Sequence, residues 1–334
     1  MIKFGSIVQL RNIVKQVEYD VKHTFIDGED VFDHSIKLPE IEFDATVKIH
    51  GTNASVVYNK DGSYYVQSRN RIISVNDDNA GFAKFVDDNK TFLLDVLKQN
   101  IHDNDTIVVY GEWAGKGIQS KVAVSEVERF FALFDIKLFK DEKHVYVDNN
   151  QYKQVLNSFT NKDSNIFSIY EFDNYVFNID FENIEKSQNQ IVSKVLEIED
   201  CCPVGKYFGV VGVGEGLVLK SKCGKYIFKA KGEKHSASKV KAISAVDIEE
   251  IENIKNFVSY AVTENRLNQG VDYLKEMKID IDMKNIGQFI KWVVSDVFKE
   301  ENDTINAHGF NDKKVTKEIS NVAKSWYIKN CFTF

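Results

Sequence analysis

The chain is short of proline, cysteine and positive charge, and each shortage excludes a class of protein. Only two prolines occur in 334 residues, and no stretch is rich in glycine, serine or proline, which argues against long disordered linkers. The four cysteines match no zinc-site spacing, so we expect reduced thiols without a metal–thiolate site. No apolar stretch approaches the roughly 20 residues that span a bilayer, and residues 1–5 lack a signal-peptide layout. We therefore expect a cytoplasmic protein (host cytoplasm if viral) with no membrane partner.

The formal charge of −7 at pH 7 disfavours a general nucleic-acid binder, because such proteins usually carry excess positive charge. The distribution of charge modifies this reading. Eight lysines fall within residues 220–241: Lys220, Lys222, Lys225, Lys229, Lys231, Lys234, Lys239 and Lys241. A run of like charges is most often a solvated face, but these lysines alternate with apolar residues, so one face of a strand becomes cationic. The segment therefore indicates a local phosphate site on an acidic protein.

The first three-quarters of the chain is predicted to mix strands and helices. Runs rich in Val, Ile, Phe and Tyr predict strands over 41–49, 55–59, 63–69, 106–113, 130–139, 175–180, 216–222 and 225–231. Turns are indicated at Asp61-Gly62 and Cys223-Gly224. Apolar residues at helical spacing predict helices over 81–99 and 184–199.

Beyond about residue 236 the strand signals vanish and amphipathic helices are predicted over 248–265, 271–277, 286–301 and 313–329. The segment 232–243 between the two parts is polar, rich in lysine and without periodicity. We therefore predict an α+β domain over residues 1–240 and a small all-α domain over residues 241–334, as the length allows.

Lys48 stands at the end of an apolar strand, just before a glycine turn. The same pattern, a lysine three residues before a glycine, also begins at Lys206, Lys229 and Lys284, so alone it is more typical of a lysine that faces water. A lysine that attacks phosphorus must be neutral, which a group of pKa near 10.4 rarely is at pH 7. Desolvation, a bound metal or nearby cations such as Arg69 and Lys231 would be needed.

Three further segments supply matching chemistry. A hydrophobic strand runs into Glu112 and then a glycine-rich turn, which suits a contact to ribose or a solvated acid equally well. The aromatic run 130–136 is mostly core, although one of its rings can instead stack on a nucleobase. Glu215 lies between glycines before a strand, where its carboxylate suits a divalent metal. Lys229 and Lys231 alternate along the next strand, so both face one side and can neutralise a phosphate.

Taken in order, these segments resemble the covalent nucleotidyltransferases, which include ATP-dependent ligases and mRNA capping guanylyltransferases. The matching positions are Lys48-Ile49-His50-Gly51, Ser68-Arg69-Asn70-Arg71, Gly111-Glu112-Trp113, Phe134-Asp135, Glu215-Gly216 and Lys229-Ala230-Lys231. Within that superfamily the chain is most similar to the RNA ligase 2 family of bacteriophages and kinetoplastid RNA-editing ligases. Residues 48–53, 111–119 and 262–268 carry this finer resemblance, which spans nearly the whole chain from residue 41.

The resemblance implies a fold and an activity. The fold is a nucleotidyltransferase (ATP-grasp-like ligase) domain of antiparallel sheets with flanking helices, followed by the helical domain. The activity is ATP-dependent RNA ligation, which joins RNA 3′-OH and 5′-phosphate ends, most simply at nicks in duplex RNA. It proceeds through lysyl-AMP and an adenylylated RNA 5′ end. ATP and Mg²⁺ or Mn²⁺ are the implied cofactors, RNA is the implied partner, and a monomer is expected.

The resemblance also implies roles for single residues. Lys48 takes AMP from ATP, His50 assists near the pyrophosphate, and Glu112 contacts the ribose. Arg69 contacts phosphate, with Arg71 as the alternative. The remaining implied roles are adenine stacking by Phe134 and Val218, further nucleotide contacts by Ile49 and Asn53, metal-dependent chemistry by Glu215, phosphate binding by Lys229 and Lys231, and RNA contacts by Lys220 and Arg266.

Two alternatives stay open on the sequence. DNA ligases and capping enzymes usually have Asp where this chain has His50, and a small β-barrel after the catalytic domain, so the helical C-terminal part speaks against both. A catalytically silent RNA-binding relative is the other alternative, although all proposed reactive positions are present.

Two features depart from the family pattern. Val47 stands where close relatives often carry an acid, and residues 141–202 match no motif.

Overall fold

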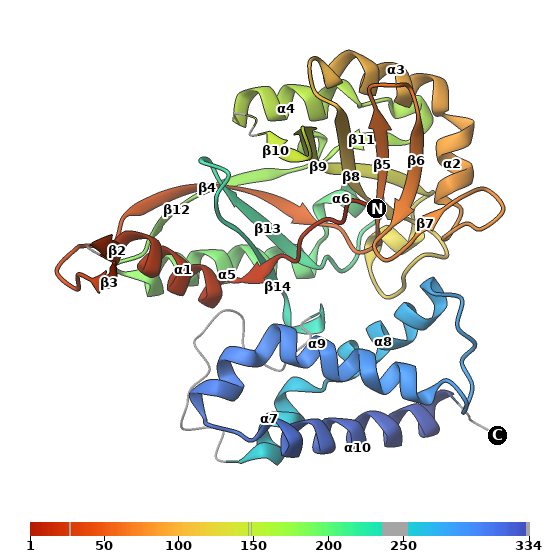
Figure 1. Cartoon of the computed structure of the whole chain (residues 1–334). Coiled ribbons are helices and arrows are strands. Elements are labelled where there is room, and N and C mark those ends of the chain that lie inside the picture. The colour runs from red at the N-terminus through yellow and green to blue at the C-terminus, as the bar shows by residue number, and fades with distance from the viewer. Residues whose placement is uncertain (27, 146, 148, 236–252, 332–334) are drawn as a thin grey trace. The chain divides into compact units, whose positions relative to one another are not determined.

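The computed structural model describes residues 1–26, 28–145, 147, 149–235 and 253–331. The chain divides into two compact units, Met1–Gly232 and Glu233–Phe334. The first unit mixes strands and helices and the second is helical, which makes the protein an α+β protein as predicted (Figure 1). The predicted domain boundary after residue 240 lies outside the described residues.

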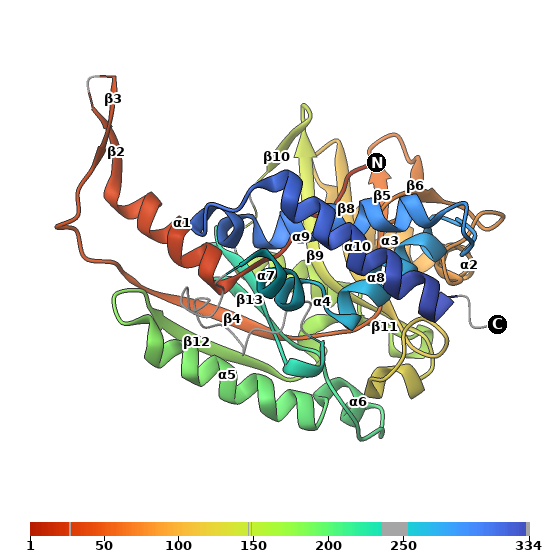
Figure 2. The ribbon, with the colours of Figure 1, turned by 90° about the horizontal axis from the view of Figure 1, so that it is seen from below.

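A five-stranded sheet, here called the first sheet, forms one layer of the first unit. Its strands lie in the order β1 (Val8–Gln9), β14 (Ile227–Lys231), β13 (Gly216–Ser221), β4 (Glu40–Lys48) and β12 (Asn174–Asp180). Only β1 and β14 pair in parallel. Alternate residues of β4, β13 and β14, such as Val47, Leu217 and Phe228, are buried. The helices α1 (Leu10–Lys22) and α5 (Ile184–Asp200) cover that buried side (Figure 2).

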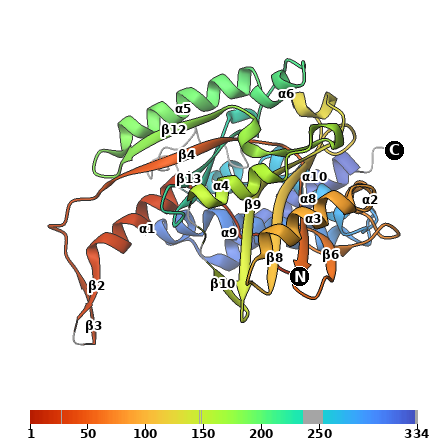
Figure 3. The same cartoon turned by 90° about the horizontal axis from the view of Figure 1, so that it is seen from above.

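A seven-stranded sheet, here called the second sheet, forms the other layer. Its path is β10 (Lys143–Val145), β9 (Phe130–Lys140), β8 (Thr106–Ala114), β5 (Thr52–Asn59), β6 (Tyr64–Ser68) and β7 (Ile72–Ile73), with β11 (Ile166–Ser168) paired to β9. The helices α2 (Phe82–Asp88), α3 (Lys90–Ile101) and α4 (Asn149–Ser158) lie along one side of it (Figure 3). Side chains from these helices and from β5, β8 and β9 form one core cluster, including Val56, Val109, Leu133, Phe82 and Leu97.

Most predicted strands are confirmed, with ends shifted by a few residues. The predicted helix 81–99 is interrupted, because α2 ends at Asp88 and α3 begins at Lys90. Between them Asn89 leaves helical geometry, and its side chain donates to the Phe85 carbonyl oxygen at 3.0 Å. The predicted helix 184–199 is confirmed as α5.

The N-terminal segment contains a helix and a hairpin that the sequence predictions omit. In α1 the buried residues Leu10, Ile13 and Val17 recur at helical spacing, a signal that is present in the sequence. The strands β2 (His23–Ile26) and β3 (Glu29–Phe32) form a separate two-stranded hairpin that projects beyond α1 (Figure 2).

The stretch without a motif, 141–202, contains β10, α4, β11, β12 and α5, and it is followed by α6 (Pro203–Tyr207). Short 3₁₀ turns connect other elements, at Ala123–Glu126, Lys162–Ser164, Ile169–Glu171 and Glu233–His235. Residues 141–202 are therefore part of the scaffold of both sheets, because β12 pairs with β4 and β11 pairs with β9.

The second unit contains the helices α7 (Ile254–Ala261), α8 (Glu264–Glu276), α9 (Ile286–Ala307) and α10 (Asp312–Cys331). Their apolar faces form one core that includes Phe257, Leu274, Phe289 and Tyr327. The predicted helix 248–265 is corrected. Residues 248–252 lie outside the described residues, and a new helix starts after Thr263, whose hydroxyl accepts the Arg266 amide at 3.3 Å.

Candidate active site

The lysines of the first sheet share the face opposite its buried side. In the ladder Gly216 pairs with both Lys48 and Lys231, and Val218 pairs with Lys229. Directly paired residues point to the same side of a sheet. The sheet register therefore places Lys48, Val218, Lys229 and Lys231 together, although they are up to 183 residues apart in sequence.

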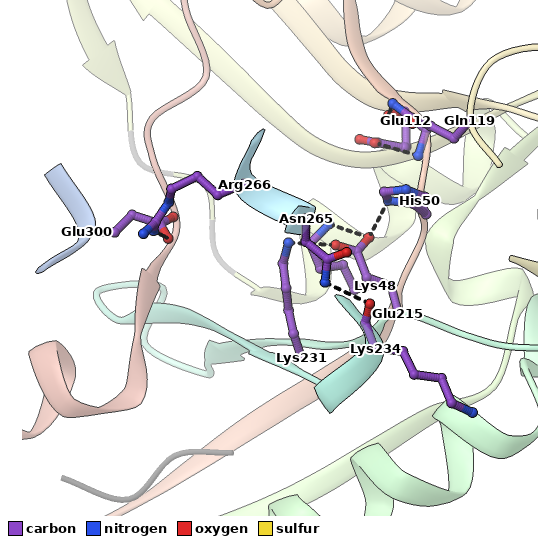
Figure 4. A network of polar contacts seen from close by, with 11 residues as sticks. Lys48, His50, Glu112, Gln119, Glu215, Lys231, Lys234, Asn265, Arg266 and Glu300 are labelled. Atoms are coloured by element: carbon purple, nitrogen blue, oxygen red, sulfur yellow. Dashed lines mark hydrogen bonds and ion pairs between the residues drawn. The ribbon is translucent and has the colours of Figure 1, made fainter. Parts of the chain in front are cut away.

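Glu215 joins the two outer lysines of this face. Its Oε2 accepts from Lys48 Nζ at 2.8 Å and its Oε1 from Lys231 Nζ at 2.7 Å. His50 Nδ1 lies 3.3 Å from the same Oε2 (Figure 4). The Glu215 side chain is 1% exposed, whereas Lys48 and Lys231 are 20% and 15% exposed. A buried carboxylate thus collects three cationic or polar donors at the end of β4.

The pKa values of the two carboxyl groups of the site are shifted in opposite directions. Burial alone would raise the pKa of Glu215, but the charges of Lys231, Lys48 and His50 hold that pKa well below its ordinary value of 4.5. Burial raises the pKa of Glu112, and the Lys48 charge opposes this only in part. Glu215 is therefore the firmly ionised acid of the pair.

Glu112 belongs to the second sheet and connects it to the turn after Lys48. Its Oε1 accepts the Gly51 amide at 3.0 Å, and Gln119 Nε2 donates to the Gly51 carbonyl oxygen at 3.4 Å (Figure 4). A Cβ at residue 51 would collide with the Trp113 carbonyl oxygen. The glycine of the Lys48 turn is thus required by this close approach of two strands.

Phe134 stands at an irregularity of the second sheet. The β8–β9 ladder pairs Tyr110 with Asp135 and the next residue, Gly111, with Leu133, which leaves Phe134 as the extra residue of a β-bulge. A bulge re-aims its side chain. The Phe4 ring packs edge-on against the Phe134 ring, with centroids 5.0 Å apart.

The other predicted nucleotide contacts lie close to these elements. Asn53 of β5 pairs with Glu112 of β8, so the two side chains share one face of the second sheet. Ile49 follows β4 and is 5% exposed. The structure therefore places Asn53 beside the predicted ribose contact, and it buries the Ile49 side chain.

Arg69 and Arg71 occupy different environments. Arg71 is tied to the loop that follows it: its Nη1 lies 2.9 Å from Asp77 Oδ2, and its Nη2 donates to the Asp78 carbonyl oxygen at 2.9 Å. Arg69 is exposed, and within the described part of the chain no hydrogen bond or ion pair engages its guanidinium. Arg69 is thus the arginine available to a ligand.

The two predicted RNA contacts are both engaged inside the protein. Lys220 Nζ lies 3.3 Å from Asp135 Oδ1 and 3.5 Å from the centroid of the Tyr152 ring. In the second unit, the fully buried Arg266 binds Asp296 Oδ2 at 2.9 Å and Glu300 Oε2 at 3.0 Å. Its Nη1 also donates to the Ala261 carbonyl oxygen. This placement gives Arg266 a structural role, and its contact with RNA stays a prediction.

Next to Arg266, Asn265 Nδ2 donates to the Lys234 carbonyl oxygen at 2.8 Å (Figure 4).

Three residues near the site carry no role from the sequence: Phe4, Asp135 and Tyr152. Asp135 had a signal, because it follows Phe134 within the matched motif, whereas Phe4 and Tyr152 lie outside every motif.

Among the described residues, no cluster of three or more His, Cys, Asp or Glu side chains is arranged to hold a metal ion. The metal contact predicted for Glu215 thus stays a prediction. None of the described helices is both long and apolar enough to cross a membrane.

Comparison with known proteins gives a family match over most of the first unit. A family model described as RNA ligase matches residues 41–231. The chain is also similar to solved structures of a Naegleria gruberi RNA ligase. The form with PPi is 19% identical, with a TM-score of 0.47, covering 70% of this chain and 56% of that chain. A variant with ATP and Mn is 19% identical, with a TM-score of 0.46 and coverages of 70% and 57%. The chain spans just over half the length of that protein.

Proposed function

Because the chain belongs to the RNA ligase family, we propose that it is an ATP-dependent RNA ligase that uses Lys48 as its nucleophile. The proposed substrates are ATP and RNA with 3′-OH and 5′-phosphate ends, most simply a nick in duplex RNA. The proposed location is the cytoplasm, and the proposed acting form is a monomer. The proposed subgroup is the RNA ligase 2 family.

The contact of Lys48 and Lys231 with one buried carboxylate carries this proposal. Three groups that bind phosphate or metal, namely the two ammoniums and the Glu215 carboxylate, lie at the end of β4. Glu112 and Phe134 approach from the second sheet, with groups suited to ribose and adenine. This arrangement of strands supports the roles proposed for these five residues.

In the proposed first step, Lys48 Nζ attacks the α-phosphorus of ATP. A P–N bond forms, the P–O bond to pyrophosphate breaks, and the ammonium must first give up a proton. Lys229 and Lys231 lie on the same face and would neutralise charge on the α-phosphate as it develops. His50, beside Glu215, would face the leaving pyrophosphate.

In the second step an RNA 5′-phosphate oxygen attacks the phosphorus of lysyl-AMP, which breaks the P–N bond and returns the lysine. In the third step the RNA 3′-hydroxyl attacks the 5′-phosphate and AMP leaves. The exposed Arg69 would bind a phosphate during these steps. Lys220 would reach RNA from its place beside Asp135.

A divalent cation fits beside Glu215. Mg²⁺ and Mn²⁺ prefer oxygen ligands and usually share a single carboxylate with phosphate oxygens and water. Glu215 offers one ionised carboxylate, and a cation would replace one or both of the ammonium groups that now contact it beside His50. Such a cation would stabilise charge on the transferring phosphate and favour the neutral form of a nearby amine.

We propose that the second unit binds RNA through a surface formed by its packed helices. Arg266 joins α8 to the acidic residues of α9, so we propose that it holds together two helices that would form part of an RNA-binding surface. A direct contact between Arg266 and RNA would first require release of its guanidinium from Asp296 and Glu300.

The test of the function is the intact mass of the protein after incubation with ATP and Mg²⁺. We expect a gain of one AMP in the wild type and none in Lys48→Ala. Lys206→Ala is the matched control, because it removes a lysine that also stands three residues before a glycine. This control should take up AMP as the wild type does.

A positive result leads to a comparison of nicked RNA duplexes with nicked DNA duplexes that carry the same sequence. Joining of DNA in preference to RNA would replace the proposal by DNA ligation. Uptake of GMP instead of AMP would indicate a capping-type guanylyltransferase. No nucleotide uptake by wild type, with prior adenylylation excluded by mass, would leave a silent RNA-binding relative.

A further inference from the structure

Tyr152, on α4, connects the two sheets at the candidate site. It comes from the stretch 141–202, which matches no motif, and it is 4% exposed. Its hydroxyl oxygen lies 2.6 Å from the Phe134 carbonyl oxygen and 2.7 Å from Asp135 Oδ1. Lys220 Nζ of the first sheet lies 3.5 Å from the centroid of its ring. One side chain therefore contacts β9 through its hydroxyl and β13 through its ring.

The hydroxyl donates at the bulge, where its proton is shared between the Phe134 carbonyl oxygen and Asp135 Oδ1. Phe134 is the extra residue of the β8–β9 bulge, and such a residue is left outside the ladder. A buried carbonyl without a donor is costly. Burial, and then the charge of Asp135, raise the pKa of Tyr152 well above its ordinary value, so this hydroxyl keeps its proton and donates.

The ring has a separate partner. An ammonium over an aromatic face is attracted by the ring, most strongly where water is partly excluded. Lys220 is 25% exposed and Asp135 is 13% exposed. Tyr152 and Asp135 together thus hold the Lys220 ammonium in one position between the two sheets.

We propose that Tyr152 is a positioning residue for both substrates of the ligase. Its hydroxyl fixes the bulge that aims the Phe134 ring at the adenine of ATP, and its ring orients Lys220 toward RNA. This inference rests on the proposed function, because Phe134 and Lys220 meet ligands only if the chain takes up ATP and RNA.

The test compares Tyr152→Phe, which removes only the hydroxyl, with Tyr170→Phe. Tyr170 is a matched control, because its ring also faces a lysine, with Lys153 Nζ 5.0 Å from the centroid. The readouts are the KM for ATP and the kcat of AMP transfer to the enzyme, together with inhibition by AMP and by tripolyphosphate. Tripolyphosphate carries no adenine, so its binding should not depend on Phe134.

For Tyr152→Phe we expect KM for ATP and Ki for AMP to rise about tenfold, as for a buried carbonyl that loses its donor. The Ki for tripolyphosphate and kcat should stay within about threefold of wild type. Tyr152→Leu, which also removes the ring, should in addition slow AMP transfer to RNA. Tyr170→Phe should match wild type in every readout.

Three results would overturn the inference. An unchanged KM for ATP in Tyr152→Phe would show that the hydroxyl does not position the adenine contact. Equal weakening of AMP and tripolyphosphate, or loss of folding in both Tyr152 variants, would assign Tyr152 to the core alone. No AMP transfer in wild type would remove the proposed function itself, which distinguishes that failure from the first two.

Discussion

Glu215→Gln should destabilise the first unit, although it preserves the shape of the side chain. The carboxylate is almost fully buried between Lys48 at 2.8 Å and Lys231 at 2.7 Å. An amide presents one oxygen and one NH₂ group, so one ammonium would meet a donor and both would lose their counter-charge. The substitution therefore turns an ion-paired cluster into an uncompensated positive one.

The size of the effect follows from burial. Removing one partner of a buried ion pair typically costs about 3–5 kcal/mol, because the other charge stays desolvated. Here Lys48 and Lys231 are 20% and 15% exposed and can partly recover water. We therefore expect a loss near the lower limit, about 3 kcal/mol at pH 7.

The loss should depend on pH in a defined direction. The pKa of Glu215 is lowered by folding, so its stabilisation is complete above its ordinary value of 4.5 and disappears as pH falls through the lowered value. The protonated Glu215 carboxyl and the amide that replaces it in Glu215→Gln are both neutral. The difference between wild type and variant should thus be constant from pH 7 to 5 and shrink in stronger acid.

The assay is urea unfolding followed by Trp113 fluorescence, with Trp292 and Trp326 of the second unit replaced by phenylalanine in every protein compared. Glu112→Gln is the matched control. Burial raises the pKa of Glu112, so its ionisation opposes folding at neutral pH and this variant should gain stability while losing activity. A loss under about 1 kcal/mol for Glu215→Gln, or one independent of pH down to 3, would refute the reasoning.

Three further predictions concern other positions. Arg266→Met should destabilise the second unit by about 3–5 kcal/mol in urea unfolding, because it removes the buried positive charge that faces Asp296, Glu300 and Glu301; a loss below about 1 kcal/mol would contradict this. Gly216→Ala should abolish AMP uptake, measured by intact mass, because a Cβ there collides with the backbone of β14 and the residue has φ +141°; normal uptake would disprove it. Arg69→Ala should reduce nick sealing in a gel assay at least about tenfold, whereas Arg71→Ala should instead lower the melting temperature; the reverse pattern would assign the phosphate contact to Arg71.

Much of the fold is predictable because its strands carry local signals. The runs that became β4, β5, β8 and β9 are long and rich in β-branched and aromatic residues. The parallel pairing of Val8 with Phe228 has no such signal, since a two-residue strand is indistinguishable from a loop in the sequence. The hairpin β2–β3 is likewise missed, because half of its residues are polar.

The candidate site can likewise be predicted from the sequence only in part. The lysines and acids of the motifs are found from their order along the chain, but their partners are not. Nothing near Glu215 indicates that its carboxylate meets Lys48, which is 167 residues away. The same reason hides Tyr152 from sequence reasoning, because its contacts with Phe134 and Asp135 depend on how α4 packs against the sheet.

The strand order of the first sheet has a consequence for synthesis on the ribosome. β4, which carries Lys48, emerges early, but both of its neighbours and the Glu215 carboxylate are translated much later. At about 5–20 residues per second, the 167 residues between Lys48 and Glu215 take roughly 8–33 s. β12 is complete at Asp180 and can then pair with one edge of β4, but the other edge of β4 waits for β13. Only when β14 has emerged can the first sheet close, so its part of the candidate site forms late.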